Sequence, residues 1–439
     1  MDKFVILSTL TGLILSLTCR GQELLTKELA IQIALENNFD IRAAKNNLEI
    51  SRNSALITNS DYLPTISGIG GANFATTNSQ NTTQANDVIS LTGVETSRYN
   101  AGINLDYTLF SGFSRKYNYQ KLQENYNLTD LQARNVMENT LFNIFNSYYQ
   151  IARLTQNQLN QSQSLTISKE RLIKAQYAFE YGQKTQLDVL NAEVDYNNDS
   201  INFLNISQSL TTEKNNLNLL LGRSIQMDFK VDTTLQFTET LGLEELLSNA
   251  LINNVDLLQQ SGNVRNASAN VKISNAAIIP RVGLSSNYTW QNNDFGPAGF
   301  FASQQSNGLN IGASLSWNIW DGGKSNTNRQ NTQIQLENQE ISLSQLKLNL
   351  ERNISNAWTL YQTALFVTIA QRKNLETNQR NFDRTKEQYL LGQINSIFFR
   401  QAQLNLLNAQ VNYNQSRYSA KTAELGLLQL SGDLLQSEL

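Results

Sequence analysis

Two hydrophobic patterns recur along this chain, and the first is a strict alternation of apolar and polar residues. Alternation with a period of two is typical of a β-strand that has one apolar and one polar face. It marks four segments: near Thr65 to Phe74, Asn100 to Leu109, Val282 to Trp290 and Leu309 to Ile319. About ten such residues match a strand that crosses an outer membrane at a tilt. A half-buried antiparallel sheet in a soluble protein alternates in the same way.

Polar segments separate the strands of each pair. One is Ala75 to Ser97, which is rich in Thr, Asn and Gln, and the other is about Gln291 to Asn307. We expect both segments to be loops on an exterior surface. Two β-hairpins are therefore predicted, at about 64–110 and 280–320.

The second pattern is heptad-like spacing over very long segments. No proline or glycine occurs from Arg115 to Tyr181, and apolar residues such as Met137, Leu141 and Ile144 recur in steps of four and three. The segment 324–391 repeats this pattern. Such spacing predicts a coiled-coil seam, on helices that would each extend roughly 100 Å at about 1.5 Å per residue.

Shorter helices precede and follow each long one. Return helices are expected at 186–221 and 397–430, after the glycines that end the long helices. An amphipathic helix is expected before each β-hairpin, at 26–61 and 242–278. We predict that both of these first helices are continuous, because the next residue that stops a helix in each case is a proline, Pro64 or Pro280.

The same order of signals occurs twice. "NNFDI", which begins at Asn37, returns 216 residues later as "NNVDL", and "YLPTISG" returns at the same offset as "IIPRVGL". "LFSGF" returns as "IWDGG" and "YGQ" as "LGQ", both at an offset of 210. This long internal repeat predicts two pseudo-equivalent units, 22–222 and 241–432, joined by a linker at 223–240 and followed by a tail at 433–439.

The N-terminus has the pattern of a signal peptide, and the composition excludes several chemistries. Lys3 precedes a mainly apolar stretch, and cleavage after Gly21 would remove residues 1–21 together with Cys19, the only cysteine. The alternative is a lipoprotein that is acylated at Cys19. There is no histidine, so zinc sites, cysteine nucleophiles and Ser-His-Asp triads are not expected in the mature chain. The formal net charge of −3 gives no basic surface for nucleic acid.

Four candidate membrane strands per chain force an assembly. Four strands cannot close a barrel, and lipid does not tolerate an open sheet edge. Two copies would give eight strands, whose interior is filled by side chains, whereas three copies would give twelve strands and room for a pore. The Asn, Ser, Thr, Gly and Asp residues on the polar strand faces suit a water-filled lumen.

These features together resemble the TolC family of outer-membrane factors, over nearly the whole mature chain. The resemblance rests on the duplicated motifs above and on a hairpin signature. The first copy of that signature comprises Phe179, Gly182, Asp188, Val189, Leu190 and Ala192; the second keeps Tyr389, Gly392 and Ala402 and differs elsewhere.

The resemblance implies a mixed α/β membrane protein. Its fold would be a trimeric 12-stranded outer-membrane β-barrel, with four strands per chain, continued by a long periplasmic coiled-coil α-barrel. Its function would be the exit duct of a tripartite efflux pump or a type I secretion system, in the outer membrane of a Gram-negative-type bacterium. Its partners would be two further copies, a periplasmic adaptor, an inner-membrane RND, ABC or MFS transporter and outer-membrane lipid. No cofactor or metal is implied.

The resemblance also assigns the helical turns to contact with the adaptor. These turns are Gly182, Gln183, Lys184 and Thr185 in the first repeat and Gly392, Gln393, Ile394 and Asn395 in the second. Relatives carry an acidic ring six and nine residues after the second turn glycine, where this chain has Phe398 and Gln401. Asp188 holds the corresponding position in the first repeat. The resemblance thus makes Asp188, Phe398, Phe399 and Gln401 the candidate residues of a periplasmic gate, with Phe398 and Phe399 as a hydrophobic constriction. The simpler roles are helix termination for the glycines, helix capping for Asp188 and packing for the phenylalanines.

Strand alternation assigns Ile103, Leu105, Leu315 and Trp317 to the lipid-facing surface. A structural or adhesive coiled-coil protein of the envelope is the main alternative; it explains the long helices but not the alternating strands. An enzyme is not expected, because no pair of carboxylates stands out among the solvated charges.

Overall fold

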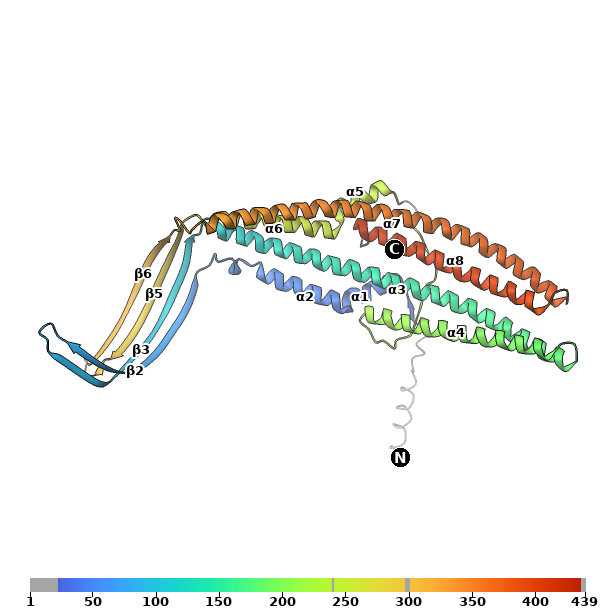
Figure 1. The fold of residues 1–439 in the computed structure, drawn as a ribbon, viewed down its shortest axis with the longest axis horizontal. Helices are drawn as coiled ribbons and strands as arrows, with labels where there is room; N and C mark the ends of the chain where they lie inside the picture. Colours follow the sequence, from blue (N-terminus) through green and yellow to red (C-terminus); the bar gives the residue numbers. More distant parts are fainter. Residues whose placement is uncertain (1–22, 239–240, 297–300, 436–439) are drawn as a thin grey trace, which may run out of the picture. The chain divides into compact units, whose positions relative to one another are not determined.

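The computed structural model describes residues 23–238, 241–296 and 301–435. The predicted signal peptide with Cys19, as well as residues 436–439 of the predicted tail, lie outside the described residues. Two sets of elements follow the same order of two helices, two strands and two helices (Figure 1). No helix among the described residues combines the length and the apolar character that a membrane span requires.

The chain divides into two compact units. We call Asn47–Leu131 with Gln259–Gln345 the strand unit, and the described residues of Met1–Asn46, Gln132–Leu258 and Leu346–Leu439 the helical unit. The two longest helices, α3 (Ser114–Glu180) and α7 (Lys324–Leu390), each contribute residues to both units.

The strand unit contains one antiparallel four-stranded sheet in the order β2-β3-β5-β6. Its strands are β2 (Thr65–Thr82), β3 (Val88–Phe110), β5 (Arg281–Asp294) and β6 (Ser303–Ser316). Residues that are directly paired across strands point to the same face of a sheet. The register therefore decides whether the apolar positions of the four strands share a face.

They do share one face. Ile103 pairs with Gly68 and Tyr288, and Tyr288 pairs with Leu309. The apolar face carries Ile66, Phe74, Tyr99, Ile103, Leu105, Tyr107, Leu284, Tyr288, Trp290, Leu309, Ile311 and Leu315. The polar face carries mainly Thr65, Ser67, Asn100, Asn104, Asp106, Ser285, Asn287, Thr289, Asn310 and Ser314. The predicted alternation thus holds in phase across the whole sheet.

The predicted loop at Ala75 to Ser97 is wrong. β2 and β3 continue their pairing as far as Thr82 and Val88, so that only residues 83–87 connect them. The register shifts between Thr77 and Ser79, where the Asn78 side chain accepts a hydrogen bond of 2.7 Å from Gly93 N. Backbone pairing needs no apolar side chain, so Thr and Asn on both faces hid this ladder. The second predicted loop is shorter for the same reason, since 291–294 and 303–307 are strand.

Trp317 lies outside the strand in which alternation placed it. β6 ends at Ser316, and the Trp317 indole donates a hydrogen bond of 3.1 Å to the Ile278 carbonyl, just before β5. Its side chain therefore contacts the base of the sheet instead of continuing the apolar row of β6.

The long helices occur at the predicted positions. α3 and α4 (Gln186–Leu220) form one helical hairpin, and α7 and α8 (Ser396–Ser431) form a second (Figure 1). In the helical unit, α3 packs against α8 through polar contacts, such as Asn414 Nδ2 to Asn157 Oδ1 at 2.9 Å. Its apolar core gathers around Tyr148 and includes Ile144, Phe145, Ile151, Leu217, Phe229, Leu425 and Leu428.

The predicted linker contributes a short strand that the sequence did not reveal. β4 (Phe229–Val231) pairs in parallel with β1 (Glu23–Leu25). Tyr148 joins the two strands, because its hydroxyl donates to Leu25 O and accepts from Asp232 N, both at 3.0 Å. Burial raises the pKa of Tyr148 to about 12, so the hydroxyl keeps its proton at physiological pH.

The predicted continuous helices before the strands are also wrong, because each one breaks at an asparagine. The first splits into α1 (Lys27–Asn37) and α2 (Phe39–Ser54), and the second into α5 (Leu243–Asn253) and α6 (Val255–Ala276). Asn38 accepts from Ile41 N at 3.0 Å and donates to Leu220 O at 2.7 Å. Asn254 accepts from Leu257 N at 3.1 Å and donates to Leu430 O at 3.0 Å.

Each asparagine thus caps one helix and binds the last turn of another. The backbone at Gly222 passes very close to the first break, and the backbone at Gly432 passes very close to the second. These glycines have φ values of +66° and +78°. A Cβ at Gly222 would overlap the Asn37 carbonyl, and one at Gly432 would overlap the Asn253 carbonyl. Glycine at these two positions therefore permits both the turn and the contact.

Asn38→Ala should lower the unfolding free energy of the helical unit by about 2 kcal/mol. The change removes a helix cap and leaves the Leu220 carbonyl without its donor. Helix content followed by far-UV circular dichroism during denaturant unfolding measures the loss. The neighbouring Asn37→Ala removes only an exposed contact and should change stability by less than about 0.5 kcal/mol. Equal effects of the two changes would contradict the proposed role of Asn38.

Candidate functional site

The free ends of the two helical hairpins have the same turn geometry. Gly182 and Gly392 have φ values of +70° and +72°. The following residue closes each turn, since Gln183 N donates to Ala178 O at 2.7 Å and Gln393 N donates to Gln388 O at 2.9 Å. No atom lies within 4 Å of a Cβ built on either glycine, so the backbone angle and not crowding favours glycine here.

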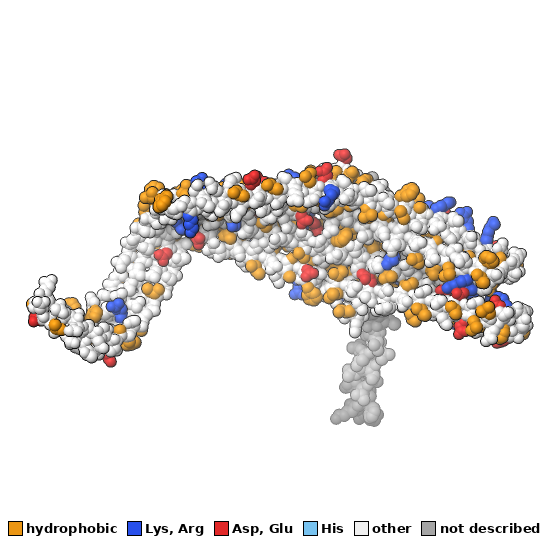
Figure 2. Space-filling model, viewed as in Figure 1, with side chains coloured by type: hydrophobic (Ala, Val, Ile, Leu, Met, Phe, Trp, Pro, Cys, Tyr) orange, Lys and Arg blue, Asp and Glu red, His pale blue; other side chains and the backbone are white. Residues whose placement is uncertain are grey.

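The sequence-predicted contact residues all lie in or beside these turns. Gln183, Thr185, Gln393 and Asn395 are exposed, and Lys184 and Ile394 are half-buried. On the face shown in Figure 2, acidic and basic side chains gather over this end of the hairpins. The turns are thus accessible in a single chain.

Asp188 caps the helix that follows the first turn. Asp188 N donates to Thr185 Oγ1 at 3.3 Å, while Asp188 Oδ2 accepts from Thr185 Oγ1 at 2.8 Å and from Thr185 N at 3.1 Å. The hydrogen bonds from the Thr185 side chain and backbone lower the pKa of the Asp188 carboxyl. This reciprocal capping box matches the simpler of the two roles that the sequence left open for Asp188.

The two phenylalanines after the second turn have different environments. Phe399 is 3% exposed and stacks on Tyr389, with ring centroids 4.6 Å apart, and on Phe382 at 5.6 Å. Phe398 is 64% exposed. Gln401 is exposed and donates to Asn405 at 2.9 Å. Phe399 therefore packs inside the chain, and Phe398 points away from its core.

A charge cluster lies further along the same hairpins, with two members buried and two half-buried. It consists of Arg171 on α3, Asp195 and Asp199 on α4, and Arg400 on α8. Arg400 binds Asp199 in a bidentate manner, with Nη1 to Oδ2 at 2.6 Å and Nη2 to Oδ1 at 2.8 Å. Asp195 bridges the two arginines, at 3.1 Å from Arg171 Nη1 and 3.4 Å from Arg400 Nε.

Polar groups of α3 and α8 surround this charge cluster. Ser168 Oγ donates to Asp199 Oδ2, and Gln403 Nε2 donates to Ser164 O at 2.8 Å. Arg171 Nη2 donates to Ser396 Oγ at 2.7 Å. The cluster therefore contains two positive and two negative side chains. Arg171, Asp195 and Asp199 come from the first hairpin, and Arg400 comes from the second. Because Asp199 has only 1% of its side chain exposed, loss of its cationic partner would leave a buried charge uncompensated.

The sequence did not single out this charge cluster. Asp195 and Asp199 stand one helical turn apart, but charged pairs on a long polar helix are usually solvated, and their shared partner Arg400 lies about 200 residues away. Among residues 23–238, 241–296 and 301–435, no group of three or more acidic or other metal-ligating side chains is placed to hold a metal ion.

The predicted lipid-facing residues mostly share the apolar face. Ile103, Leu105 and Leu315 lie on it, and Leu315 is 71% exposed. Leu105 is half-buried, and Trp317 lies beyond the end of β6. The rows on β3 and β6 therefore have the predicted phase, whereas the predicted position of Trp317 is wrong.

Comparisons with known proteins agree with this architecture. Residues 30–223 and 246–433 match the family described as Outer membrane efflux protein. The outer membrane efflux protein BepC of Brucella suis is 23% identical over 426 residues, covering 95% of this chain and 88% of that protein. The toluene efflux pump outer membrane protein TtgC of Pseudomonas putida is 24% identical over 415 residues, covering 92% and 82%.

Solved structures show the same fold. The Campylobacter jejuni CmeC outer membrane channel superposes with a TM-score of 0.79 at 16% sequence identity, covering 93% of this chain and 86% of that one. At such low sequence identity, this structural similarity shows a shared fold and nothing more.

Arg400→Met should destabilise the helical unit by about 3–5 kcal/mol, because it leaves Asp199 buried without its bidentate partner. Arg384→Met on the exposed surface of α7 is the matched control and should change stability by less than about 0.5 kcal/mol. Denaturant unfolding measures both changes. Similar stabilities of the two variants would show that the charge cluster does not hold the hairpins together.

Proposed function

This chain belongs to the outer membrane efflux protein family, and we propose that it is a homotrimeric exit duct that conducts solutes from the periplasm to the exterior. Family membership supports the outer-membrane location and the role in efflux. The observation on this chain that carries the proposal is the in-phase sheet, with one face of exposed apolar side chains and one of Asn, Ser and Thr. Such a sheet suits lipid on one side and water on the other.

The edges of the sheet support assembly from several copies. Among the described residues, β2 pairs only with β3 and β6 pairs only with β5. Both outer strands therefore present unpaired backbone groups, which lipid does not tolerate. Three copies bring twelve strands together, the number for which we propose an open lumen.

α4 and α7 carry exposed apolar side chains that fit the same assembly. Leu187, Leu190, Val194, Ile201 and Leu204 recur along α4 at heptad spacing, and each is at least half exposed. On α7, Leu360, Phe366 and Ile369 are also exposed. We propose that these rows pack against helices of neighbouring copies, as knobs pack into holes in coiled coils.

The turns Gly182–Thr185 and Gly392–Asn395 are the proposed contact with a periplasmic adaptor, which would connect the duct to an inner-membrane RND, ABC or MFS transporter. Their accessibility and their equivalent geometry in the two hairpins support this assignment. TtgC is named as part of a toluene efflux pump, and CusC of Escherichia coli, 23% identical over 406 residues, is named as part of a cation efflux system. Efflux of small solutes is therefore the preferred role, and type I secretion of proteins is the alternative.

We propose that the periplasmic end is closed by packing and by the charge cluster, without an acidic ring. Phe398 and Gln401 supply no carboxylate, and the Asp188 carboxylate is engaged by Thr185. Exposed Phe398 side chains from several copies would restrict wetting without attracting cations.

Trivalent cations added from the periplasmic side should therefore block the channel only weakly. A strong block that Asp188→Asn removes would assign the constriction to the first hairpin.

Purified full-length protein should contain three chains per detergent-solubilised particle and should give single-channel conductance in planar bilayers. Light scattering coupled to size-exclusion chromatography measures the first property, and electrophysiology measures the second. A stable monomer that forms no channels would contradict the proposal. That result would favour the structural or adhesive envelope protein.

Leu315→Arg should destabilise the assembled channel by roughly 2–4 kcal/mol, because it places a charge on the proposed lipid-facing surface. Ser314→Arg, one residue away on the polar face, should assemble normally and change the conductance. Thermal dissociation of the oligomer on gels measures the first effect, and bilayer current measures the second. The opposite pattern would show that the assignment of the two faces is reversed.

A further inference from the structure

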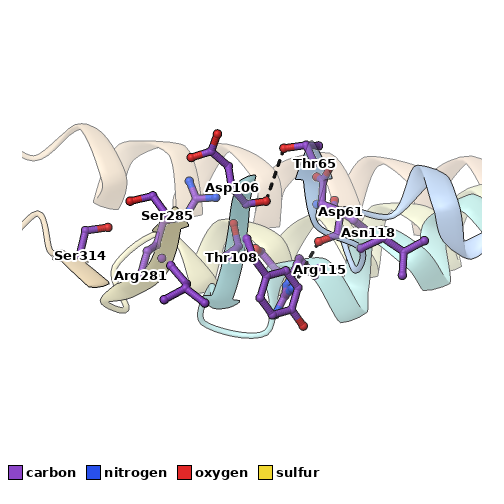
Figure 3. Close-up of a pocket in the computed structure, with 14 residues that line it drawn as sticks. Asp61, Thr65, Asp106, Thr108, Arg115, Asn118, Arg281, Ser285 and Ser314 are labelled. Carbon is purple, nitrogen blue, oxygen red and sulfur yellow. Dashed lines mark hydrogen bonds between the residues drawn. The ribbon is translucent and has the colours of Figure 1, made fainter. Parts of the chain in front are cut away.

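A polar cavity of about 380 Å³ lies at the end of the sheet where β3 leads into α3 (Figure 3). Hydroxyl groups from several strands line it, including Thr65, Thr108, Ser285 and Ser314. These four residues belong to the polar face, because Thr65 pairs with Asp106, Asp106 with Ser285, and Thr108 and Ser314 both with Gly283. These hydroxyl groups therefore lie on the face that we assign to the lumen.

Two arginines line this cavity, and the first is held in place. Arg115, in the first turn of α3, donates to Asp61 O at 3.2 Å and to Leu109 O at 3.0 Å. Its guanidinium carbon also lies 5.1 Å from the ring centroid of Tyr62 and 5.7 Å from that of Tyr107. Within the described part of the chain, no carboxylate lies within 4 Å of this guanidinium.

The second arginine has no partner for its charge among the residues that the structure describes. Arg281 begins β5 and faces the cavity, and its guanidinium makes no hydrogen bond or ion pair with any residue that the structure describes. The polar face has only two other charged residues in the described strands, Arg98 and Asp106. Arg98 differs from Arg281 because its Nε donates to Asn293 Oδ1 at 3.0 Å.

We propose that this cavity is a weak binding site for the carboxylate or phosphate group of solutes that pass through the duct. Arg281 supplies an exposed guanidinium, which matches the fork of such an anion, and Arg115 adds a fixed positive charge. The hydroxyl groups of Thr108, Ser285 and Ser314 donate further hydrogen bonds. Asp106 opposes a bound anion and keeps the affinity low, as conduction requires of any site on the path. This inference rests on the proposed channel function.

Benzoate block of single-channel current in planar bilayers tests the site on the full-length protein, with benzylammonium as the cation of matched shape. Benzoate should reduce the wild-type current, and Arg281→Gln should raise the half-blocking concentration about threefold, as suits an exposed charge pair. Asp106→Asn should lower it by a similar factor. Arg98→Gln, on the same face but outside the cavity, should leave it unchanged.

The outcomes separate the two proposals. Wild-type channels that benzoate and benzylammonium block equally would overturn the anion site and leave the channel function intact. An equal shift in Arg281→Gln and Arg98→Gln would replace the site with a general effect of lumenal charge. A protein that forms no channels would overturn both the channel function and the site.

Discussion

The backbone hydrogen bonds at the two edges of the sheet are the constraint on which the rest of the structure depends. Among the described residues, β2 and β6 each have one partner strand, and the face they share with β3 and β5 is apolar and exposed. In water, the free edges would be solvated, but the apolar face would remain uncovered. In lipid, the apolar face would be covered, but the backbone groups at the two edges would lack hydrogen-bond partners. Pairing with further copies, as we propose, satisfies both. The exposed heptad row of α4 and the exposed apolar side chains of α7 fit the same assembly.

Inside one chain, polar contacts act together with the apolar core to keep the two helical hairpins in register. Asn38 and Asn254 join each broken helix to the last turn of a long return helix, and Asn157, Asn414 and Gln403 join α3 to α8. Arg171, Asp195, Asp199 and Arg400 complete the set near the turns. Hydrogen bonds and ion pairs have directional geometry, so they specify one alignment of two long helices. An apolar seam alone would tolerate sliding by a heptad.

The sequence predicted what depends on local pattern and missed what depends on distant partners. The long helices and their turns follow from unbroken heptad spacing and from Gly182 and Gly392. The two faces of the sheet follow from alternation, and the register confirms them. Asn38 and Asn254 were visible in the duplicated motif, but their role as breaks needs the carbonyls of Leu220 and Leu430, far along the chain. The extension of β2 and β3 was hidden because β2 carries Thr, Asn, Ser and Gln on both faces there. The roles of Arg281 and Arg400 depend on residues that are distant in the sequence and come close only in the folded chain.

Cross-linking between the edge strands of different copies tests the central claim most directly. In a Cys19→Ser background the chain has no other cysteine, and Gly68 of β2 has open space for a side chain. Cysteine at Gly68 would be combined in turn with cysteine at Leu309, Ile311 or Ala313 of β6, and a thiol-specific bifunctional reagent added. We predict that at least one combination yields covalent species that end at three chains, while Gly68→Cys alone yields none. Cross-links confined to single chains in every combination would show that the sheet does not close through neighbouring copies.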